Sequence, residues 1–379
     1  MLVKNLYPTA LLAAFPAAAQ QILTSVATPT YALVQSSKAA YQDYSGSTAS
    51  ITEIDLGTRQ KRVLLPAGLG GAQPYHYEYY YAGADMAYVP FSLMATYPLH
   101  HMNVQTGATR SVSSHQGWKE TVWVGGGVIV WADYRHKTAS DQNSEIYMAP
   151  AAGGSEVRLT SDTRYQTKPV TDGRRIAWLD YAAGSRAQVV LYTIQGGATI
   201  TIAPSDSHQD NPRLDGDYVI WEDYRNAKTD TTNVDIYAYR IGSGQVTPLC
   251  TAPGFQGKPF LHNQGAVWDD HRNVSGDNKN VDIYGYDFVA GREVAISTHA
   301  AYQSSPVHYL NRIVWFQVDG STMNLYSATL SFNATSLQPL NRRKTLRGPS
   351  QFIRVDGRLD FRPVSAPPAF TLCRHCVVP

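Results

Sequence analysis

The sequence predicts an all-β fold, a seven-bladed β-propeller whose blades are four-stranded and antiparallel. Three observations predict it. An aromatic residue recurs seven times at nearly constant spacing, similar strand and turn residues surround most copies, and the composition suits short strands joined by tight turns. The chain has 25 Tyr, 7 Trp and 10 Phe together with 29 Gly and 21 Pro. Aromatic residues favour strands, whereas Gly and Pro favour turns.

The recurring aromatic residue ends an apolar segment that we expect to be the second strand of each blade. Successive copies are separated by 47, 43, 47, 43, 47 and 47 residues. A unit of this length accommodates the four strands of a propeller blade. Because each blade packs only on its neighbours, 379 residues can form one propeller rather than two domains. The seven copies are Tyr41, Tyr88, Trp131, Trp178, Trp221, Trp268 and Trp315.

Similar residues surround the recurring Trp in the copies that match best. Trp221 is followed by Asp223 and Arg225, and the copies at Trp131 and Trp268 have the same spacing. A polar loop then leads to an alternating segment such as 235–239, which indicates a half-buried third strand. A turn containing Gly and a short outer strand complete the unit. A Gln-x-x-Pro sequence opens the first strand in four copies, at Gln166, Gln209, Gln256 and Gln303.

These units resemble the TolB-like propeller repeats of exported proteins, which read Gln-x-x-Pro, Trp-x-Asp-x-Arg-Asn and Asp-Ile-Tyr-x-Tyr. The resemblance covers about residues 27–340 and is strongest over 116–330, whereas the first two copies are degenerate. It implies the propeller fold. TolB itself has an α/β domain before its propeller, for which this chain has no room, so the resemblance does not imply a role in the Tol system.

The N-terminus reads as a signal peptide over residues 1–19. Lys4 precedes an apolar run that ends in three alanines, 17–19, as expected before a cleavage site. The run is shorter than the roughly 20 residues of a membrane span, and Pro8 and Pro16 interrupt it. We therefore expect a secreted or periplasmic protein without a membrane span.

The propeller is expected over residues 20–345, followed by a segment at 346–379. Residues 350–363 echo the sequence around 172–178. They can open an eighth blade, completed by residues 20–27, or close the last blade against the first. Seven blades is the main prediction and eight is the alternative.

Three cysteines are present, Cys250 within the repeats and the tail pair Cys373 and Cys376. In an oxidising compartment the pair can form a local disulfide, or one of them can pair with Cys250. An odd number leaves one thiol unaccounted for.

The charge balance restricts the partners. The net charge is +2 and charged residues make up 16% of the chain, so the sequence contains no basic field that would hold nucleic acid. We expect a monomer that binds a polysaccharide or a surface protein, with no membrane span and no nucleic acid.

One face of the propeller is the expected site. The loop that enters the first strand and the loop between the second and third strands lie on the same side of an antiparallel blade. These loops contain His115, His208, Asp180, Tyr181 and the Asp-x-Arg sequences. Because Asp and Arg recur in several blades, a structural ion pair or turn cap explains them better than one active site.

Some propeller polysaccharide lyases, including the ulvan lyases, use a His pair with Tyr and Arg on one face, and the loop residues here are similar in type. Elimination from a uronate needs a cation for the carboxylate, a base for the C5 proton and an acid for the leaving oxygen. The resemblance implies His115 and His136 as base and neutraliser, Arg225 as carboxylate ligand and Tyr181 or Tyr224 as acid. No complete lyase motif is present.

Carboxylates recur in the loops between the second and third strands, where oxygen ligands can bind calcium. Their spacing does not match an EF-hand, and we expect no required cofactor, with Ca²⁺ as a possible ligand. His100 and His101 are adjacent, so on a strand they point to opposite faces, which argues against both being ligands of one metal. The candidate metal ligands are Asp223, Asp230, Asp235, Asp270, Asp277 and Asp282.

Non-catalytic binding of a glycan or a cell-surface protein through this face is the function that the sequence favours. A polysaccharide lyase that acts on uronate polymers by β-elimination is the alternative, and a purely structural surface module is a third hypothesis. A propeller fold alone does not define an activity.

Overall fold

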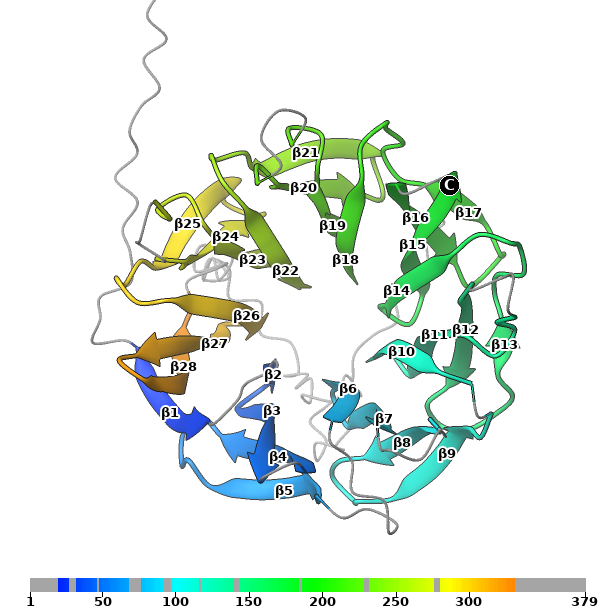
Figure 1. The fold of residues 1–379 in the computed structure, drawn as a ribbon, viewed down its shortest axis with the longest axis horizontal. Coiled ribbons are helices and arrows are strands. Elements are labelled where there is room, and N and C mark those ends of the chain that lie inside the picture. The colour runs from blue at the N-terminus through cyan, green and yellow to red at the C-terminus, as the bar shows by residue number, and fades with distance from the viewer. Residues whose placement is uncertain are drawn as a thin grey trace, which may run out of the picture. The chain divides into compact units, whose positions relative to one another are not determined.

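The computed structural model describes residues 20–330, apart from 27–31, 46–47, 68–75, 92–96, 116, 139–142, 184–185, 228–231 and 276–279. These residues form seven sheets of four antiparallel strands, arranged as blades around a central axis (Figure 1). The predicted seven-bladed propeller is confirmed. Among the described residues, no helix is long and apolar enough to span a membrane.

Each blade is a meander that runs outward from the axis. Blade 1 contains β2 (Ala32–Gln35), β3 (Lys38–Ser45), β4 (Thr48–Asp55) and β5 (Lys61–Leu65). Blade 2 contains β6 (His76–Ala82), β7 (Asp85–Phe91), β8 (Leu99–Asn103) and β9 (Thr109–Ser113). Blade 3 contains β10 (Lys119–Gly125), β11 (Val128–Asp133), β12 (Glu145–Pro150) and β13 (Val157–Arg158). Blade 4 contains β14 (Gln166–Thr171), β15 (Arg175–Ala183), β16 (Arg186–Thr193) and β17 (Thr199–Thr201).

The remaining blades follow the same plan. Blade 5 contains β18 (Gln209–Asp215), β19 (Tyr218–Asp223), β20 (Asp235–Arg240) and β21 (Gln245–Cys250). Blade 6 contains β22 (Gln256–His262), β23 (Gly265–Asp270), β24 (Asp282–Asp287) and β25 (Arg292–Ser297). Blade 7 contains β26 (Gln303–Tyr309), β27 (Arg312–Asp319), β28 (Thr322–Thr329) and, as its outer strand, β1 (Gln21–Val26).

The N-terminal strand closes the ring. β1 pairs antiparallel with β28, with Ile22 opposite Tyr326 and Ser25 opposite Asn324. The pairing protects the edge that β28 would otherwise expose. Residues 20–27 were the proposed completion of an eighth blade, and that alternative is wrong for β1, which belongs to blade 7. The signal peptide at 1–19 and the segment 346–379, with its echo at 350–363, lie outside the described residues.

The recurring aromatic residues all lie on second strands, as predicted. Trp221 in β19 is opposite Tyr237 in β20, and Trp268 and Trp315 are opposite Tyr284 and Tyr326. Trp221 is completely buried and packs in a cluster that includes Val189 of the preceding blade. These side chains therefore fill the space between adjacent sheets, where burial of a large aromatic contributes most to stability.

Each first strand in blades 3 to 7 contains a β-bulge next to a residue with positive φ. The register shifts occur two residues after the residue that opens the strand. A left-handed backbone is uncommon for a residue other than Gly, and its recurrence in five blades indicates a built feature. The five residues are Thr121, Lys168, Asn211, Lys258 and Ser305, with φ of 48°, 52°, 47°, 49° and 58°.

Carboxylates of neighbouring blades support two of these bulges. Glu222 accepts a hydrogen bond from the backbone N–H of Lys258 at 2.7 Å, and Asp269 accepts one from the N–H of Ser305 at 2.7 Å. Both carboxylates are buried at the position that follows the recurring Trp. The strained backbone is thus held from the adjacent blade, and the bulge residue is directed toward the axis, where it lines a cavity.

Candidate functional site: an aromatic arc and an axial cavity

Two aromatic positions recur on the predicted face. In blades 3 to 7 one aromatic residue immediately precedes the first strand, and in blades 3 to 6 the other follows the Asp that lies two residues after the recurring Trp. The backbone joins the two within a blade, as in the bond from Tyr224 N to His208 O at 3.0 Å and from Tyr181 N to Tyr165 O at 3.0 Å. We call the whole set the aromatic arc: Trp118, Tyr134, Tyr165, Tyr181, His208, Tyr224, Phe255, His271 and Tyr302.

Neighbouring rings of the arc contact one another within blades 4 and 5 and across the boundary between these two blades. Ring centres are 5.2 Å apart for Tyr165 and Tyr181, 6.0 Å for Tyr181 and His208, and 5.0 Å for His208 and Tyr224. Most members are half-buried. Trp118 and Tyr302 are 42% and 38% exposed. The arc therefore presents partly exposed ring surfaces in blades 3 to 7, with ring contacts that run from Tyr134 to Tyr224.

Glu120 anchors one end of the arc. Its Oε1 accepts hydrogen bonds from the hydroxyls of Tyr134 at 2.9 Å, Tyr165 at 3.1 Å and Thr167 at 3.0 Å. The two tyrosine oxygens are also 2.9 Å apart. Burial raises the pKa of both tyrosines, so these hydroxyls stay neutral donors. Their rings are consequently fixed in orientation.

His208 lies at the centre of the run of ring contacts. Its Nδ1 accepts the backbone N–H of Ala187 at 3.0 Å, so the neutral ring carries its proton on Nε2. Burial lowers the pKa of His208, which favours this neutral form. In that form neither ring nitrogen is free to take a proton. The residue is suited to donating a hydrogen bond, and poorly suited to act as a general base.

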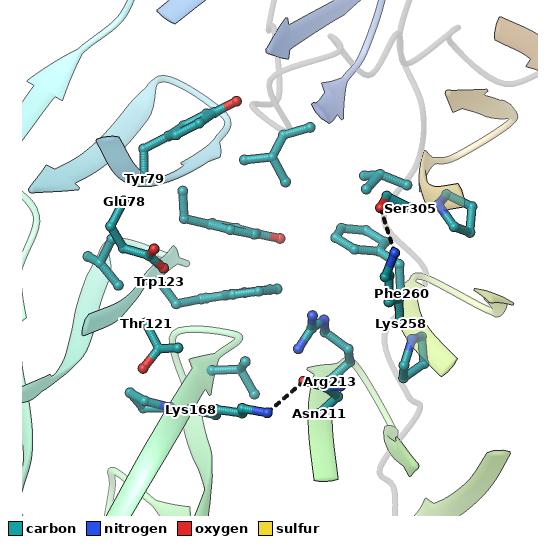
Figure 2. Close-up of a pocket in the computed structure, with 18 residues that line it drawn as sticks. Glu78, Tyr79, Thr121, Trp123, Lys168, Asn211, Arg213, Lys258, Phe260 and Ser305 are labelled. Atoms are coloured by element: carbon teal, nitrogen blue, oxygen red, sulfur yellow. Dashed lines mark hydrogen bonds between the residues drawn. The ribbon is translucent and has the colours of Figure 1, made fainter. Parts of the chain in front are cut away.

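Beside the arc, the first strands line an axial cavity of about 320 Å³ (Figure 2). Its wall includes Tyr80, whose ring stacks on Trp123 with centres 3.5 Å apart, and Phe260, 6.4 Å from Trp123. The guanidinium carbon of Arg213 is 5.2 Å from the centre of the Trp123 ring. Lys168 lies three residues beyond Tyr165 of the arc, so the arc and the cavity are continuous along the first strands.

Two of the three cations at the cavity have carboxylate partners. Lys168 is 2.6 Å from Asp210, and Lys258 is 3.2 Å from Asp269. Burial raises the pKa of Asp269 to about 6, and Lys258 opposes that rise. Arg213 differs, because no carboxylate among the described residues lies within ion-pair distance of it.

The predicted ligand Arg225 is committed to the blade. It donates from Nε and Nη2 to Asp223, at 2.8 and 2.7 Å, and its guanidinium carbon lies 4.0 Å from the centre of the Tyr237 ring. Arg135 and Arg272 make the same two contacts in their blades, on Tyr147 and Tyr284. The threefold repetition agrees with the structural role that the sequence favoured for these arginines.

The structure brings together only part of the predicted lyase set. Tyr181 and Tyr224 flank His208. His136 contacts the hydroxyl of Tyr147 at 2.9 Å, and His115 accepts the N–H of Gly117 at 3.1 Å. No hydrogen bond or ion pair among the described residues joins either histidine to Arg225. A catalytic role for the five stays a prediction.

The described candidate metal ligands also have protein partners. Asp223 and Asp270 hold the arginines, while Asn226 donates to Asp235 and Asn273 donates to Asp282, both at 2.6 Å. Asp230 and Asp277 lie outside the described residues. Within the part of the chain that the structure describes, no group of three His, Cys, Asp or Glu is placed to hold a metal.

The histidine pair on β8 behaves as the strand geometry predicts. His100 stacks on Tyr88 with ring centres 5.2 Å apart, whereas His101 contacts Asp85 at 2.8 Å. Cys250 is buried and has no disulfide partner among the described residues. Arg272 contacts its sulfur at 3.1 Å. The two tail cysteines lie outside the described residues.

Several site residues were not predicted. Tyr165, Phe255 and Tyr302 stand immediately before three of the Gln-x-x-Pro sequences, so aligning the repeats one residue further would have shown the second aromatic position. Trp123 and Arg213 carry no such signal, because they are single residues at equivalent places on two first strands. Their meeting depends on the curvature of the whole ring.

No known protein family model matches this chain, and no curated protein matches it. Solved structures do resemble it. TolB from Acinetobacter baumannii is among them, at 15% identity and a TM-score of 0.47, over 78% of this chain and 65% of TolB.

Two other structures match more closely in shape. The β-propeller domain of the Trilobed protease from Pyrococcus furiosus has a TM-score of 0.60 at 9% identity, over 79% of this chain and 94% of that domain. Oligogalacturonate lyase from Vibrio parahaemolyticus has a TM-score of 0.58 at 11% identity, over 82% and 93%. At these identities the likeness concerns the propeller fold alone.

Proposed function

We propose that this protein binds a polysaccharide across the aromatic arc without cleaving it. The supporting observation is the recurrence of partly exposed aromatic rings at two equivalent positions in successive blades. A catalytic centre needs different groups at one point, whereas a repeated surface offers the same contact again and again. A polymer of similar units suits such a surface.

Sugar rings have apolar faces and a polar rim, and half-buried aromatic rings match both. The ring surfaces of Trp118 and Tyr302 provide apolar contact, and tyrosine and histidine polar atoms provide hydrogen bonds. Glu120 fixes Tyr134 and Tyr165, and ring contacts hold Tyr181, His208 and Tyr224. These side chains therefore lose little conformational entropy on binding.

The contacts of the predicted catalytic residues favour binding over catalysis. Arg225 is engaged with Asp223, and His136 contacts the hydroxyl of Tyr147. His208, which lies between Tyr181 and Tyr224, has no acceptor nitrogen available in its neutral form. Burial and the neighbouring Glu222 and Asp210 raise the pKa of Tyr224, which makes it a weak acid. We therefore place the lyase hypothesis second.

The test measures affinity for a panel of neutral and acidic polysaccharides by affinity electrophoresis and calorimetry. The double variant Trp118→Ala, Tyr302→Ala should bind about tenfold more weakly or worse. Leu310→Ala is the matched control, because this 53% exposed side chain lies in the turn between β26 and β27, on the opposite side of the blade.

An unchanged affinity in the double variant would contradict the role of the arc, and a native protein that binds no member of the panel would contradict the function. The same incubations are followed for ultraviolet absorbance of an unsaturated product. Its appearance would identify a lyase instead.

We also propose that the protein is exported, because residues 1–19 have the pattern of a cleaved leader. N-terminal sequencing of secreted material should begin at or near Gln20. A mature chain that begins at Met1 would overturn this proposal.

A further inference from the structure

We propose that the axial cavity is a subsite for one terminal sugar unit bearing an anionic group, a carboxylate or a sulfate, which Arg213 binds. The inference rests on the proposed function and deepens it, because it adds a chain-end subsite to the arc. It predicts that the protein recognises the end of an acidic chain.

The argument begins with the environment of Arg213. The guanidinium donates from Nη1 to the carbonyl of its neighbour Pro212 at 2.8 Å, while its buried Nε has no partner. A buried donor without a partner costs free energy, and a guanidinium matches the two oxygens of a carboxylate or sulfate. The residue lines the cavity, as Figure 2 shows.

The neighbouring cations do not need an external anion in the same way. Lys168 and Lys258 are paired with Asp210 and Asp269, so their charges are largely offset within the protein. Glu222 interacts electrostatically with Arg213. Its carboxylate already accepts hydrogen bonds from Asn211 and from the backbone N–H of Lys258. Among the three cations of the cavity, Arg213 is therefore the one that can bind an anionic ligand without losing a carboxylate partner.

The walls of the cavity suit the body of a sugar unit. Trp123 stacks with Tyr80 and lies opposite the guanidinium, and Phe260 contributes a third ring. A pyranose placed against such rings presents its apolar face to them and its charged substituent to Arg213. The bulges that direct Asn211 and Ser305 toward the axis add polar groups at the rim.

The size of the cavity restricts the ligand to the end of a chain. A volume of about 320 Å³ lies at the lower limit of sites for small molecules, so it suits one sugar unit rather than a passing polymer. The arc, by contrast, extends over several blades. A chain lying along the arc can thus place its last unit in the cavity.

The experiment compares Arg213→Met with native protein and with Arg292→Met, a control on the exposed outer strand β25. The probes are a short oligogalacturonate, a sulfated galactan oligosaccharide of the same length and a neutral galactan oligosaccharide. Arg213→Met should weaken binding of at least one acidic probe about tenfold, leaving the neutral probe within about twofold. Arg213→Lys should recover part of the loss, because it keeps the charge but not the fork.

The two acidic probes distinguish a carboxylate from a sulfate. A chain-end site also predicts that an acidic oligosaccharide with its terminal acid esterified or removed loses as much affinity as Arg213→Met does. Equal losses for acidic and neutral probes would overturn the inference, since Arg213 would then act only in packing. Unchanged binding of both acidic probes would overturn it as well.

Failure of the arc and failure of the cavity give different results. If the arc variant loses binding while Arg213→Met does not, the cavity inference is wrong and the proposed function stands. If no oligosaccharide binds, saturation-transfer NMR with free galacturonate and galactose 6-sulfate tests the cavity alone. Binding of either that disappears in Arg213→Met would support the subsite without the arc, and no binding would overturn it.

Discussion

The indole Nε1 of Trp221 donates a hydrogen bond to Oδ2 of Asp223 at 2.8 Å. The same oxygen accepts Arg225 at 2.7 Å, while Oδ1 accepts the backbone N–H of Arg225 at 2.9 Å. One buried carboxylate thus joins the core of the blade to the loop that follows. The indole bond recurs from Trp131 to Asp133 and from Trp268 to Asp270.

Asp223→Asn should destabilise the protein by about 2–4 kcal/mol, because it removes the charge partner of Arg225 and one acceptor of the network. Asp180→Asn is the matched comparison in blade 4. There Trp178 Nε1 and Asp180 Oδ1 have no hydrogen-bond partner, and burial raises the pKa of Asp180. That variant should cost less than about 1 kcal/mol in urea unfolding, and equal losses would contradict the argument.

The residue pattern of the repeat was sufficient to predict the fold. The spacing of the recurring Trp residues placed every one of them on a second strand, because a meander of fixed length returns each blade to the same register. The partner of the last sheet was not predictable. Residues 21–26 do not match the residue pattern of the repeat. Only the closed ring shows that they pair with the outer edge of β28.

The site was predictable only where it repeats. The face followed from strand direction, and Tyr181, His208 and Tyr224 were assigned to it before the structure showed their contacts. The lyase residues were chosen by type, and the sequence could not show that Arg225 stacks on Tyr237 and turns toward its own blade. Side-chain direction depends on rotamers and neighbours that spacing does not encode.

The pH dependence of stability should contain a contribution from Asp235. Its Oδ1 has no hydrogen-bond partner, and burial raises its pKa from 3.8 to about 6. Between about pH 4 and pH 6 the folded protein therefore binds more protons than the unfolded chain, so stability falls as pH rises through this window. Above it the loss remains constant.

Asp235→Asn removes this contribution and should be more stabilising, relative to native protein, at pH 8 than at pH 4.5. Urea unfolding at both values measures the difference, and the exposed Asp217→Asn is the control. Burial also raises the pKa of Asp269, so the free energy of unfolding of Asp235→Asn still falls in part as pH rises. If the free energy of unfolding changes by the same amount between the two pH values in the variant and in native protein, the contribution assigned to Asp235 is wrong.

Lys119 occupies the place of the repeat's Gln in blade 3 and is completely buried. It donates to the backbone carbonyls of His115 and Gly117 and lies 3.7 Å from Asp133. Lys119→Met leaves these acceptors without a donor and should cost about 2–4 kcal/mol. Lys119→Gln restores the repeat residue and should cost less than about half as much in urea unfolding. Equal costs would show that the two positions are not equivalent.

His136→Asn separates the arc from the lyase set. In blades 5 and 6 the equivalent residues, Asn226 and Asn273, donate to Asp235 and Asp282. Glu145 stands at the corresponding position in blade 3. An asparagine at 136 can therefore make a similar bond, and the free energy of unfolding should change by less than about 1 kcal/mol. His136 contacts Tyr147, so its loss should leave the arc intact.

Affinity for acidic and neutral glycans is then measured at pH 5.5 and pH 8 in native protein and in His136→Asn. If the ligand lies on the arc and in the axial cavity, the two proteins bind equally at both values, because His136 touches neither surface. The lyase hypothesis predicts the opposite, a ligand that contacts His136 and that binds more weakly to His136→Asn. A loss of affinity in the variant would therefore extend the site to His136 and would restore it as a ligand-binding residue.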